Sequence, residues 1–468
     1  MRTILVGSLA AAAALAACSP SDKPAVKPAE TPAAAATNPG NHPEWSKNAV
    51  IYEVNIRQYT PEGTFAAFTK ELPRIRALGV DILWIMPVQP IGKLYRKGTL
   101  GSYYSISDYT AVNPEFGTEG DFKAMVDAAH AQGFKVILDW VANHTAFDHA
   151  WATAHKDWYS LHPDGTISRA IDDKGKETDW SDVADLNYAS KDMRAAMIKE
   201  MRWWVDSTGI DGFRCDVAGF VPYDFWAEVR AALRPVKPDL FFLAEWEDPA
   251  LHASFDATYD WGLYHLMNGI GAGKQKASAL DSYFSEFESK YPSGAYRLAF
   301  TSNHDENSWN GTEFERLGEN YKAAYILSVL VQNSLPLLYS GQEVSFNRRL
   351  PFFEKDSIDW KKGPSLAEFY GRIFELRHQN DLVWNGAWGA PQQKLVTDGA
   401  DHVYAFTRAR GEKAVLVVTN FSDKPLRVKF EGLAQTGSYT DWFSHATLSL
   451  TASGSIDMPA HGYRVLVK

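Results

Sequence analysis

From Trp45 onward, short apolar segments alternate with longer amphipathic ones along most of the chain. The apolar segments have the length and the Val, Ile, Leu and Phe content of buried β-strands. They are Val50–Tyr59, Asp81–Val88, Lys135–Val141, Gly209–Val217, Leu240–Trp246, Asp256–Trp261, Arg297–His304 and Leu335–Gly341. Stretches between them carry apolar residues at helical spacing, as in Thr64–Leu78, Thr118–Gln132, Lys191–Thr208, Tyr223–Leu233 and Tyr321–Gln332. This order predicts an α/β chain with a (β/α)₈ TIM barrel. A doubly wound open sheet is the alternative, but it leaves the polar clusters at so many strand ends unexplained.

Two regions depart from this alternation. Residues 145–188 lack a strong helical pattern and are rich in Gly, Asp, Ser and Trp, so we expect a small inserted lobe after the third strand, over the mouth of the barrel. After a last barrel helix at about Ser365–Gln379, residues 384–468 alternate apolar and polar positions in short segments separated by turn residues. This pattern predicts a C-terminal antiparallel β-sandwich domain that follows a catalytic barrel spanning residues 45–383.

The N-terminus has the pattern of a processing segment. Residues 1–18 contain Arg2, an apolar run too short to span a membrane, and a Leu-Ala-Ala ending before Cys18. They resemble a bacterial lipoprotein signal peptide, which implies cleavage before Cys18 and lipidation of its thiol. Residues 19–44, rich in Pro and Ala, then form a semi-extended tether. We expect an exported protein, lipid-anchored to the cell envelope, with Ser19 favouring the outer membrane.

Charge and composition narrow the class of partner. The 468-residue chain has a net charge of −10, which argues against nucleic acid and anionic membrane surfaces as partners. Its 16 Trp and 21 Tyr residues fit an ordinary core, but they also fit a carbohydrate site, where sugar rings stack on aromatic planes. Once Cys18 is set aside, Cys215 is the one remaining cysteine, so no disulfide is expected within the folded part.

The segment Gly212-Phe-Arg-Cys-Asp216 closes the fourth predicted strand with an arginine two residues before an aspartate. On a strand this spacing points both side chains to one face, so Arg214 is expected to keep Asp216 ionised. An ionised carboxylate at the carboxyl end of a barrel strand is a candidate nucleophile. Cys215 should point the other way and act as a buried apolar filler.

Glu245 ends the next predicted strand, where Phe241, Phe242, Leu243 and Trp246 surround it in sequence. A partly desolvated glutamate has a raised pKa and can protonate a leaving oxygen. One ionised and one protonated carboxyl group are what a retaining glycosidase requires. An ordinary charge at a strand end is the alternative for Glu245 taken alone.

Two further polar clusters close apolar segments, at Asp139-Trp-Val-Ala-Asn143-His144 and at Asn303-His304-Asp305. Asp305 can hydrogen-bond substrate hydroxyls and help keep the acid protonated by like-charge proximity. Asp139 can contact substrate or merely brace a strand end. Each cluster alone is also typical of turns and caps. Four clusters at four different strands favour an active site.

These four clusters match the signature segments of the α-amylase family, glycoside hydrolase family thirteen, and the chain resembles that family over nearly all of residues 45–468. Supporting matches are Asp185-Leu-Asn187, Gly101-Ser-Tyr-Tyr104-Ser-Ile-Ser-Asp108 and Pro336-Leu-Leu-Tyr-Ser-Gly-Gln-Glu343. The resemblance implies Asp216 as nucleophile, Glu245 as general acid/base and Asp305 as transition-state stabiliser. It implies that Tyr104 stacks under the sugar that is cleaved. The remaining predicted substrate contacts are Asp139, His144, Arg214, Trp246 and His304.

The chain departs from many α-amylases directly after the nucleophile, where Val217-Ala218-Gly219-Phe220 replaces a segment that carries a lysine and a histidine. Gly219 lacks the side chain that would contact the sugar on the leaving-group side, so altered subsite preference is expected. Asn143 and Asp185 match usual calcium ligands of the family, and oxygen donors suit Ca²⁺. Both residues can equally hydrogen-bond the lobe to the barrel, so calcium as a cofactor stays open.

Three functional hypotheses remain. The first is hydrolysis of α-glucosidic bonds in starch-derived glucans or maltooligosaccharides through a covalent glycosyl-enzyme intermediate. The second is a glucanotransferase that passes the same intermediate to a sugar acceptor. The third, a non-catalytic glucan-binding lipoprotein, is disfavoured because Asp216, Glu245 and Asp305 are all present. The sequence does not decide between chain-end and internal cleavage, or the oligomeric state.

Overall fold

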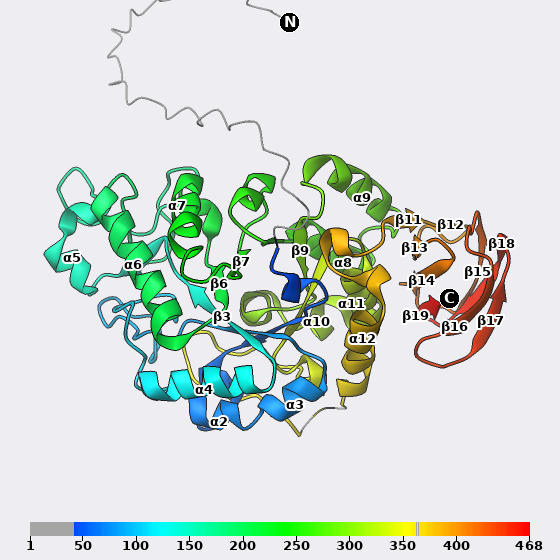
Figure 1. The fold of residues 1–468 in the computed structure, drawn as a ribbon, viewed down its shortest axis with the longest axis horizontal. Coiled ribbons are helices and arrows are strands. Elements are labelled where there is room, and N and C mark those ends of the chain that lie inside the picture. The colour runs from blue at the N-terminus through cyan, green and yellow to red at the C-terminus, as the bar shows by residue number, and fades with distance from the viewer. Residues whose placement is uncertain (1–41, 362, 364) are drawn as a thin grey trace, which may run out of the picture. The chain divides into compact units, whose positions relative to one another are not determined.

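A computed structural model describes residues 42–361, 363 and 365–468 (Figure 1). The predicted signal peptide, the lipidation site Cys18 and nearly all of the predicted tether lie outside the described residues. The tether was predicted to extend to residue 44, which is too far. His42 already stacks on Tyr296 with 4.0 Å between the ring centroids, and its Nε2 lies 3.1 Å from the Gly294 carbonyl. Residues 42–44 therefore belong to the folded barrel.

Eight parallel strands close into a barrel in the order β1-β10-β9-β8-β7-β6-β3-β2, which confirms the predicted (β/α)₈ architecture. All eight predicted strand positions are occupied. The strands are β1 Ile51–Val54, β2 Ile82–Ile85, β3 Lys135–Trp140, β6 Gly212–Cys215, β7 Phe241–Ala244, β8 Ala257–Tyr259, β9 Tyr296–Ala299 and β10 Ser334–Tyr339.

Helices surround these strands (Figure 1). They are α1 Ile56–Tyr59, α2 Phe65–Thr69, α3 Leu72–Ala77, α4 Glu119–Ala131, α5 Ala150–Ala154, α6 Lys191–Thr208, α7 Tyr223–Leu233, α8 Trp261–Gly271, α9 Ala279–Lys290, α10 Glu313–Leu317, α11 Tyr321–Leu330 and α12 Ala367–Gln379. None of the helices in the described part of the chain is both long and apolar enough to cross a membrane.

Side chains alternate between the two faces of the barrel wall, as strand geometry requires. On β7, Phe241 and Leu243 belong to the cluster inside the barrel, together with Trp84 of β2. Phe242, the residue between them, belongs to the cluster packed under the helices. Cys215 of β6 lies in that outer cluster as well, fully buried and unpaired, as predicted. Because strands of a parallel barrel all point one way, the residues that follow them meet at one rim.

Most predicted strands extend beyond the observed ones, and two predicted elements also differ in kind. The first predicted strand, Val50–Tyr59, is strand only as far as Val54 and continues as the short helix α1. The predicted helix Thr64–Leu78 is divided into α2 and α3, and Pro73 lies in the first turn of α3. Proline lacks the N–H that a continuous helix would need at that point, so the helix restarts there.

The inserted lobe forms where it was predicted, after β3. Its base is a two-stranded antiparallel ribbon of β4, His144–Ala146, and β5, Val183–Asp185. Between these strands the chain contains one short α-helix, α5, a 3₁₀ helix at Lys156–Trp158, and otherwise turns and isolated bridges. His144 and Asp185 are paired residues of this ribbon, so the lobe is anchored directly at the carboxyl end of β3.

The C-terminal region is a pair of antiparallel sheets, in agreement with the predicted β domain. The larger sheet has the order β11-β13-β14-β19-β16-β17 and the smaller one β12-β15-β18. Their bounds are β11 Gln392–Lys394, β12 Val396–Thr397, β13 Val403–Arg410, β14 Lys413–Asn420, β15 Leu426–Glu431, β16 Gly437–Asp441, β17 Thr447–Leu450, β18 Ser453–Met458 and β19 Tyr463–Val467. Side chains from both sheets form one apolar cluster that includes Leu416, Val428 and Phe430.

Candidate active site

A fully buried arginine, Arg214, joins the carboxylates at the rim of the barrel. Its Nη1 donates to Asp139 Oδ1 at 2.9 Å and to Asp216 Oδ1 at 3.0 Å. Its Nη2 lies 2.7 Å from Glu245 Oε1, an ion pair between β6 and the end of β7. The sequence prediction that Arg214 and Asp216 share one face of the strand is confirmed. The same guanidinium also faces the predicted acid, which the sequence did not indicate.

The charge state of Asp216 is set by more than Arg214. Burial and the neighbouring Glu245 raise the pKa of Asp216 well above its usual value, while Arg214 acts in the opposite direction. The prediction that Arg214 keeps this carboxylate ionised was therefore wrong about the balance of effects, because burial and Glu245 outweigh the guanidinium. Asp216 and Glu245 share one guanidinium in a desolvated space.

The surroundings of Glu245 differ from the sequence prediction. Phe242 faces away from the barrel interior, so strand alternation removes it from the carboxyl group. The polar neighbours of that group are Arg214 and the backbone N–H of Val217, which donates to Glu245 Oε2 at 2.8 Å. Val217 has a φ of 35°, in the left-handed region that β-branched residues rarely adopt. The strained backbone after Asp216 thus aims an N–H at the second carboxylate.

His304 links Asp305 to the opposite side of the barrel. Its Nδ1 lies 2.5 Å from Glu53 Oε1 on β1, and its Nε2 lies 3.2 Å from Asp305 Oδ2 and 2.8 Å from the Tyr104 hydroxyl. Burial alone would lower the pKa of His304, but Asp305 and Glu53 outweigh it and raise that pKa well above the usual value. The imidazole is therefore a buried cation between two carboxylates.

Asp139 and Tyr104 complete this network. Asp139 Oδ2 accepts hydrogen bonds from Trp84 Nε1 at 3.0 Å and from the Tyr104 hydroxyl at 3.1 Å. With Arg214 on its other oxygen, Asp139 is fully enclosed by protein groups. Burial raises its pKa to about 6, against the effect of Arg214. Asp139 therefore braces the strand end, which was the second of its two predicted roles.

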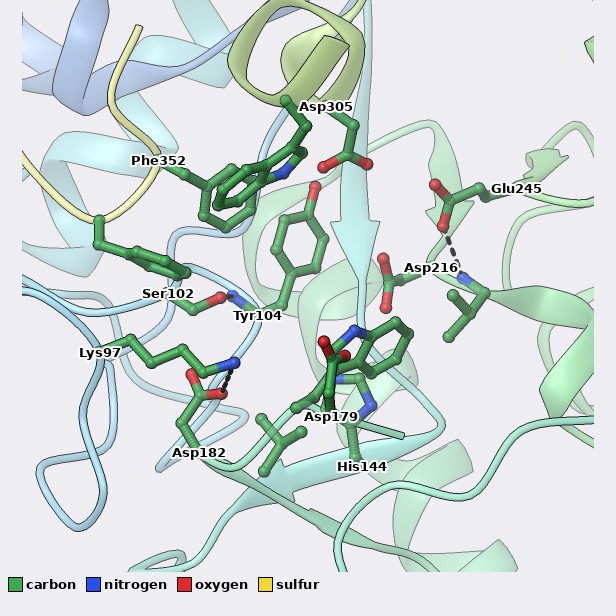
Figure 2. Close-up of a pocket in the computed structure, with 15 residues that line it drawn as sticks. Lys97, Ser102, Tyr104, His144, Asp179, Asp182, Asp216, Glu245, Asp305 and Phe352 are labelled. Carbon is green, nitrogen blue, oxygen red and sulfur yellow. Dashed lines mark hydrogen bonds and ion pairs between the residues drawn. The ribbon is translucent and has the colours of Figure 1, made fainter. Parts of the chain in front are cut away.

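A cavity of about 450 Å³ opens above this network. Asp216, Glu245 and Asp305 all line it, and Figure 2 shows their carboxylates directed into one space beside the ring of Tyr104. His144 lines the cavity too; burial lowers its pKa to about 3, so its imidazole is neutral. The cavity thus combines three carboxyl groups with an aromatic ring and a neutral histidine.

Four predicted substrate contacts are absent from the residues that line this cavity, namely Asp139, Arg214, His304 and Trp246. The first three lie beneath it and orient the groups that do line it. Trp246 packs against Phe220, with 5.2 Å between the ring centroids. Direct contact with substrate was therefore the wrong expectation for Asp139, whose oxygens already have protein partners.

Sequence reasoning missed most of the outer lining. The missed residues come from loops and from the lobe, and they are Lys97, Ser102, Asp179, Trp180, Asp182, Val183, Val217, Trp309, Phe352 and Phe353. Trp309 carried a usable signal, because it follows Asn303-His304-Asp305 closely and is an aromatic residue. It is half exposed on a π-helical turn, Glu306–Asn310, and packs against the ring of Phe352. Such short π-helical turns are common at functional sites.

The glycine at position 219 has a packing reason. A Cβ built on Gly219 would lie 2.2 Å from the indole of Trp246, so any side chain there would displace this ring. The indole of Trp246 therefore occupies the space that a sugar-contacting side chain at position 219 would need.

The two predicted calcium ligands already have protein partners. Asp185 Oδ2 accepts from Ser160 Oγ at 2.7 Å, and its Oδ1 accepts from the backbone N–H of Ile171 at 2.9 Å. Asn143 Nδ2 lies 3.3 Å from His144 Nδ1. Among the described residues, no three His, Cys, Asp or Glu side chains gather as a metal site. The bonds of Asp185 fit the lobe-bracing alternative, because both of its carboxyl oxygens accept hydrogen bonds from residues of the lobe.

Comparisons with known proteins agree with this geometry. The family model "Alpha amylase, catalytic domain" matches residues 35–372, and "Alpha amylase, C-terminal all-beta domain" matches residues 395–462. The structures of a noncanonic maltogenic alpha-amylase, AmyB, from Thermotoga neapolitana and of an alpha-amylase from Lactobacillus plantarum both superpose with a TM-score of 0.81. They are 28% and 29% identical, and the matches cover 90% and 91% of this chain and 99% of each of those chains.

Among curated proteins, Alpha-amylase MalA of Haloarcula japonica is 27% identical over 84% of this chain. The chain spans 58% of the length of that protein. An alpha-1,4-glucan:maltose-1-phosphate maltosyltransferase of Rhodospirillum rubrum is 35% identical over 42% of this chain and 31% of its own length.

Proposed function

Because the chain belongs to the α-amylase family of glycoside hydrolases, we propose that it cleaves α-glucosidic bonds in starch-derived glucans or maltooligosaccharides with retention of configuration. One observation carries this proposal. Asp216, Glu245 and Asp305 come from the ends of three different barrel strands and line a single cavity. A shared space for three carboxyl groups fits an attack on one anomeric carbon.

The residues divide the reaction between them. In its ionised form Asp216 attacks the anomeric carbon through Oδ, while Glu245 gives its proton to the glycosidic oxygen, so the C–O bond breaks and the leaving sugar departs with that proton. Water then attacks the glycosyl-Asp216 ester and transfers a proton back to Glu245. Arg214 holds both carboxyl groups and limits their repulsion. Asp305, with the charged His304 behind it, faces the positive charge that develops on the sugar.

Two substitutions test these roles on maltooligosaccharides. Asp216→Asn should lower kcat by roughly 10³-fold or more, because the amide cannot form the glycosyl ester. Glu245→Gln should lose activity mainly on substrates with poor leaving groups, since aryl glucosides with good leaving groups need little protonation. Wild-type turnover by Asp216→Asn, or equal losses on both substrate types for Glu245→Gln, would contradict the assignment.

Transfer to a sugar acceptor is the second candidate, favoured by the similarity to a maltosyltransferase. Both activities use the same intermediate and differ in whether water or a sugar accepts it. A time course on maltotriose separates them: products no longer than the substrate indicate hydrolysis, and products longer than the substrate indicate transfer. Starch, pullulan and cyclodextrin, each tested with and without a chelator, then define the linkage preference and the role of calcium.

We also propose that the protein is exported and lipid-anchored at the cell envelope. This rests on the signal-like residues 1–18 and on Cys18 after Leu-Ala-Ala. Expression in bacteria with a radiolabelled fatty acid should label the wild type and leave Cys18→Ser unlabelled. Equal labelling of both proteins, or of neither, would overturn the proposal.

A further inference from the structure

An ion pair faces the catalytic cavity from two separate elements. Lys97 Nζ, on the long connection between β2 and α4, lies 3.2 Å from Asp182 Oδ1, just before β5 of the lobe. Both residues line the cavity, and Lys97 is the one lysine or arginine among the described lining residues. The Asp182 side chain is 5% exposed and that of Lys97 is 29% exposed, so the pair is largely desolvated and only partly screened by solvent.

The position of this pair relative to the catalytic groups defines which end of the substrate it faces. Figure 2 shows Lys97 and Asp182 at one side of the cavity and Glu245 at the other, with Tyr104 and Asp216 between them. The sugar that leaves takes its proton from Glu245 and lies on that side. The sugar retained on Asp216 continues in the other direction, toward the non-reducing end of the glucan. Lys97 and Asp182 therefore stand where the non-reducing part of the substrate must lie.

The chain around Lys97 is fixed on two sides, so the pair is part of a wall. Thr99 N donates to Glu354 Oε1 at 2.8 Å and Leu100 N donates to the Phe353 carbonyl at 3.1 Å. Gly98 has a φ of 62°, and a Cβ on it would lie 2.5 Å from Phe353 Cβ, so only glycine permits this close approach. On the other side, Ser105 Oγ donates to the Asp182 carbonyl at 2.9 Å.

The cavity that this wall bounds has a volume of about 450 Å³, in the lower half of the range of ~300–1,000 Å³ that ligand pockets occupy. A long glucan that passed straight through the cavity would need the cavity to be open at both ends. A glucan that binds by its chain end needs only one opening.

We propose that the Lys97–Asp182 pair closes the cavity at the non-reducing side and makes the enzyme act on chain ends, releasing products of short and uniform length. This inference rests on the proposed glucan-cleaving function. The pair supplies what a terminal sugar requires: the ammonium group donates hydrogen bonds to hydroxyl oxygens, and the carboxylate accepts from hydroxyl hydrogens. An internal glucose has no free hydroxyl at the linking position and would collide with the wall.

The test compares three maltooligosaccharide substrates with the full chain. One is linear with a free non-reducing end, one carries an acetal that blocks the hydroxyls of that end, and one is a cyclodextrin, which has no end. The wild type should cleave the free linear substrate at least tenfold faster, in kcat/KM, than either of the others. Lys97→Ala should narrow this ratio at least tenfold and turn a uniform product into a mixture of lengths.

Controls separate this inference from the proposed function. Lys93→Ala removes an exposed lysine from the same connection and should leave the ratio unchanged. Asp182→Asn keeps the shape of the side chain but removes its charge. It should lower the preference for the free linear substrate, in kcat/KM, as Lys97→Ala does. Equal wild-type cleavage of all three substrates would overturn the closed-end proposal and leave glucan cleavage intact. No cleavage of any of them would overturn the proposed function itself.

Discussion

At the scale of single residues, the site depends on buried charges that are each paired. Arg214 faces Asp139, Asp216 and Glu245, and His304 faces Glu53 and Asp305. A buried charge without a partner costs several kcal/mol. Removing one partner should therefore change the protonation of the others, and Glu53 offers the cleanest case because it lies outside the substrate cavity.

The first prediction concerns Glu53→Gln. Glu53 is one of the two carboxylates that raise the pKa of His304, so its loss should lower that pKa. The imidazolium then loses its proton at lower pH, and the alkaline limb of the kcat/KM profile should move down by about one pH unit. Glu115→Gln, which removes an exposed partner of Arg57, should leave the limb in place.

Stability gives an independent measurement for the same variant. The folded-state pKa of His304 lies above its unfolded value of about 6.5. Its charge therefore stabilises the fold fully below pH ~6.5, and this contribution is lost as the pH rises through the folded-state pKa. The melting temperature of the wild type should exceed that of Glu53→Gln most at acidic pH. A constant difference across the whole pH range would contradict the assigned charge of His304.

At the scale of elements, the lobe and the barrel connections shape the site that the strands present. The strand ends supply Asp216 and Glu245, while the lobe supplies Asp182 and His144. The lobe is short of regular structure, and β4 and β5 have three residues each. Its position therefore depends strongly on side-chain bonds such as those of Asp185 to Ser160 and Ile171.

The second prediction concerns Asp185→Asn. Burial raises the pKa of Asp185 to about 6, so the folded state favours the protonated acid. That contribution to stability is complete below the unfolded pKa of about 4 and is lost as the pH rises through about 6. Asparagine stays neutral and can still accept from Ile171 N–H while donating to Ser160. The melting temperature of the variant relative to wild type should therefore rise between pH 4 and pH 7.

The same variant separates lobe bracing from calcium binding. If Asp185 only braces the lobe, calcium should not change the melting temperature of either protein at pH 7. Each protein should then melt at the same temperature with calcium as with a chelator. A calcium ligand would give the opposite result: the wild type would be stabilised by calcium, and Asp185→Asn would lose that gain.

At the scale of the whole molecule, the β domain is built into the barrel by buried polar contacts. Arg408 of β13 is fully buried and donates to four carbonyl groups outside its own sheet, those of Leu330, Val331, Trp384 and Ala390. Leu330 is the last residue of α11, where helical carbonyls lack partners within the helix. The β domain thus packs on the barrel through particular buried hydrogen bonds.

The third prediction concerns Arg408→Met, which keeps an unbranched apolar stem, removes the guanidinium and leaves these carbonyl groups without their donor. It should lower the free energy of unfolding by roughly 1–3 kcal/mol for each carbonyl group left buried and unsatisfied, with a single calorimetric transition for barrel and β domain together. Arg427→Met serves as the matched control, because the Arg427 side chain is 72% exposed. It should change stability by at most about 0.5 kcal/mol. Two separate transitions in the wild type would contradict the joint unfolding.

Much of the site could be predicted because its signals are local. Asp139, Asp216 and Glu245 each stand at or directly after an apolar strand, so strand geometry alone brings them to one rim. The error at Glu245 has a physical cause as well. Neighbours in sequence were treated as neighbours in space, although alternate residues of a strand face opposite sides. The short helix α1 after Val54 was missed for a related reason. Its four residues, Ile56–Tyr59, are too few to distinguish the period of a helix from that of a strand.

The amino-acid sequence by itself determined the order of strands and helices, the inserted lobe, the β domain and the three carboxyl groups, because each follows from a repeating pattern or a short motif. The tertiary structure alone decided which groups pair. Glu53 meets His304 from 251 residues away, and Lys97 meets Asp182 across two loops without any regular spacing. Such contacts depend on how the barrel closes and how loops pack over it, and no local periodicity encodes either.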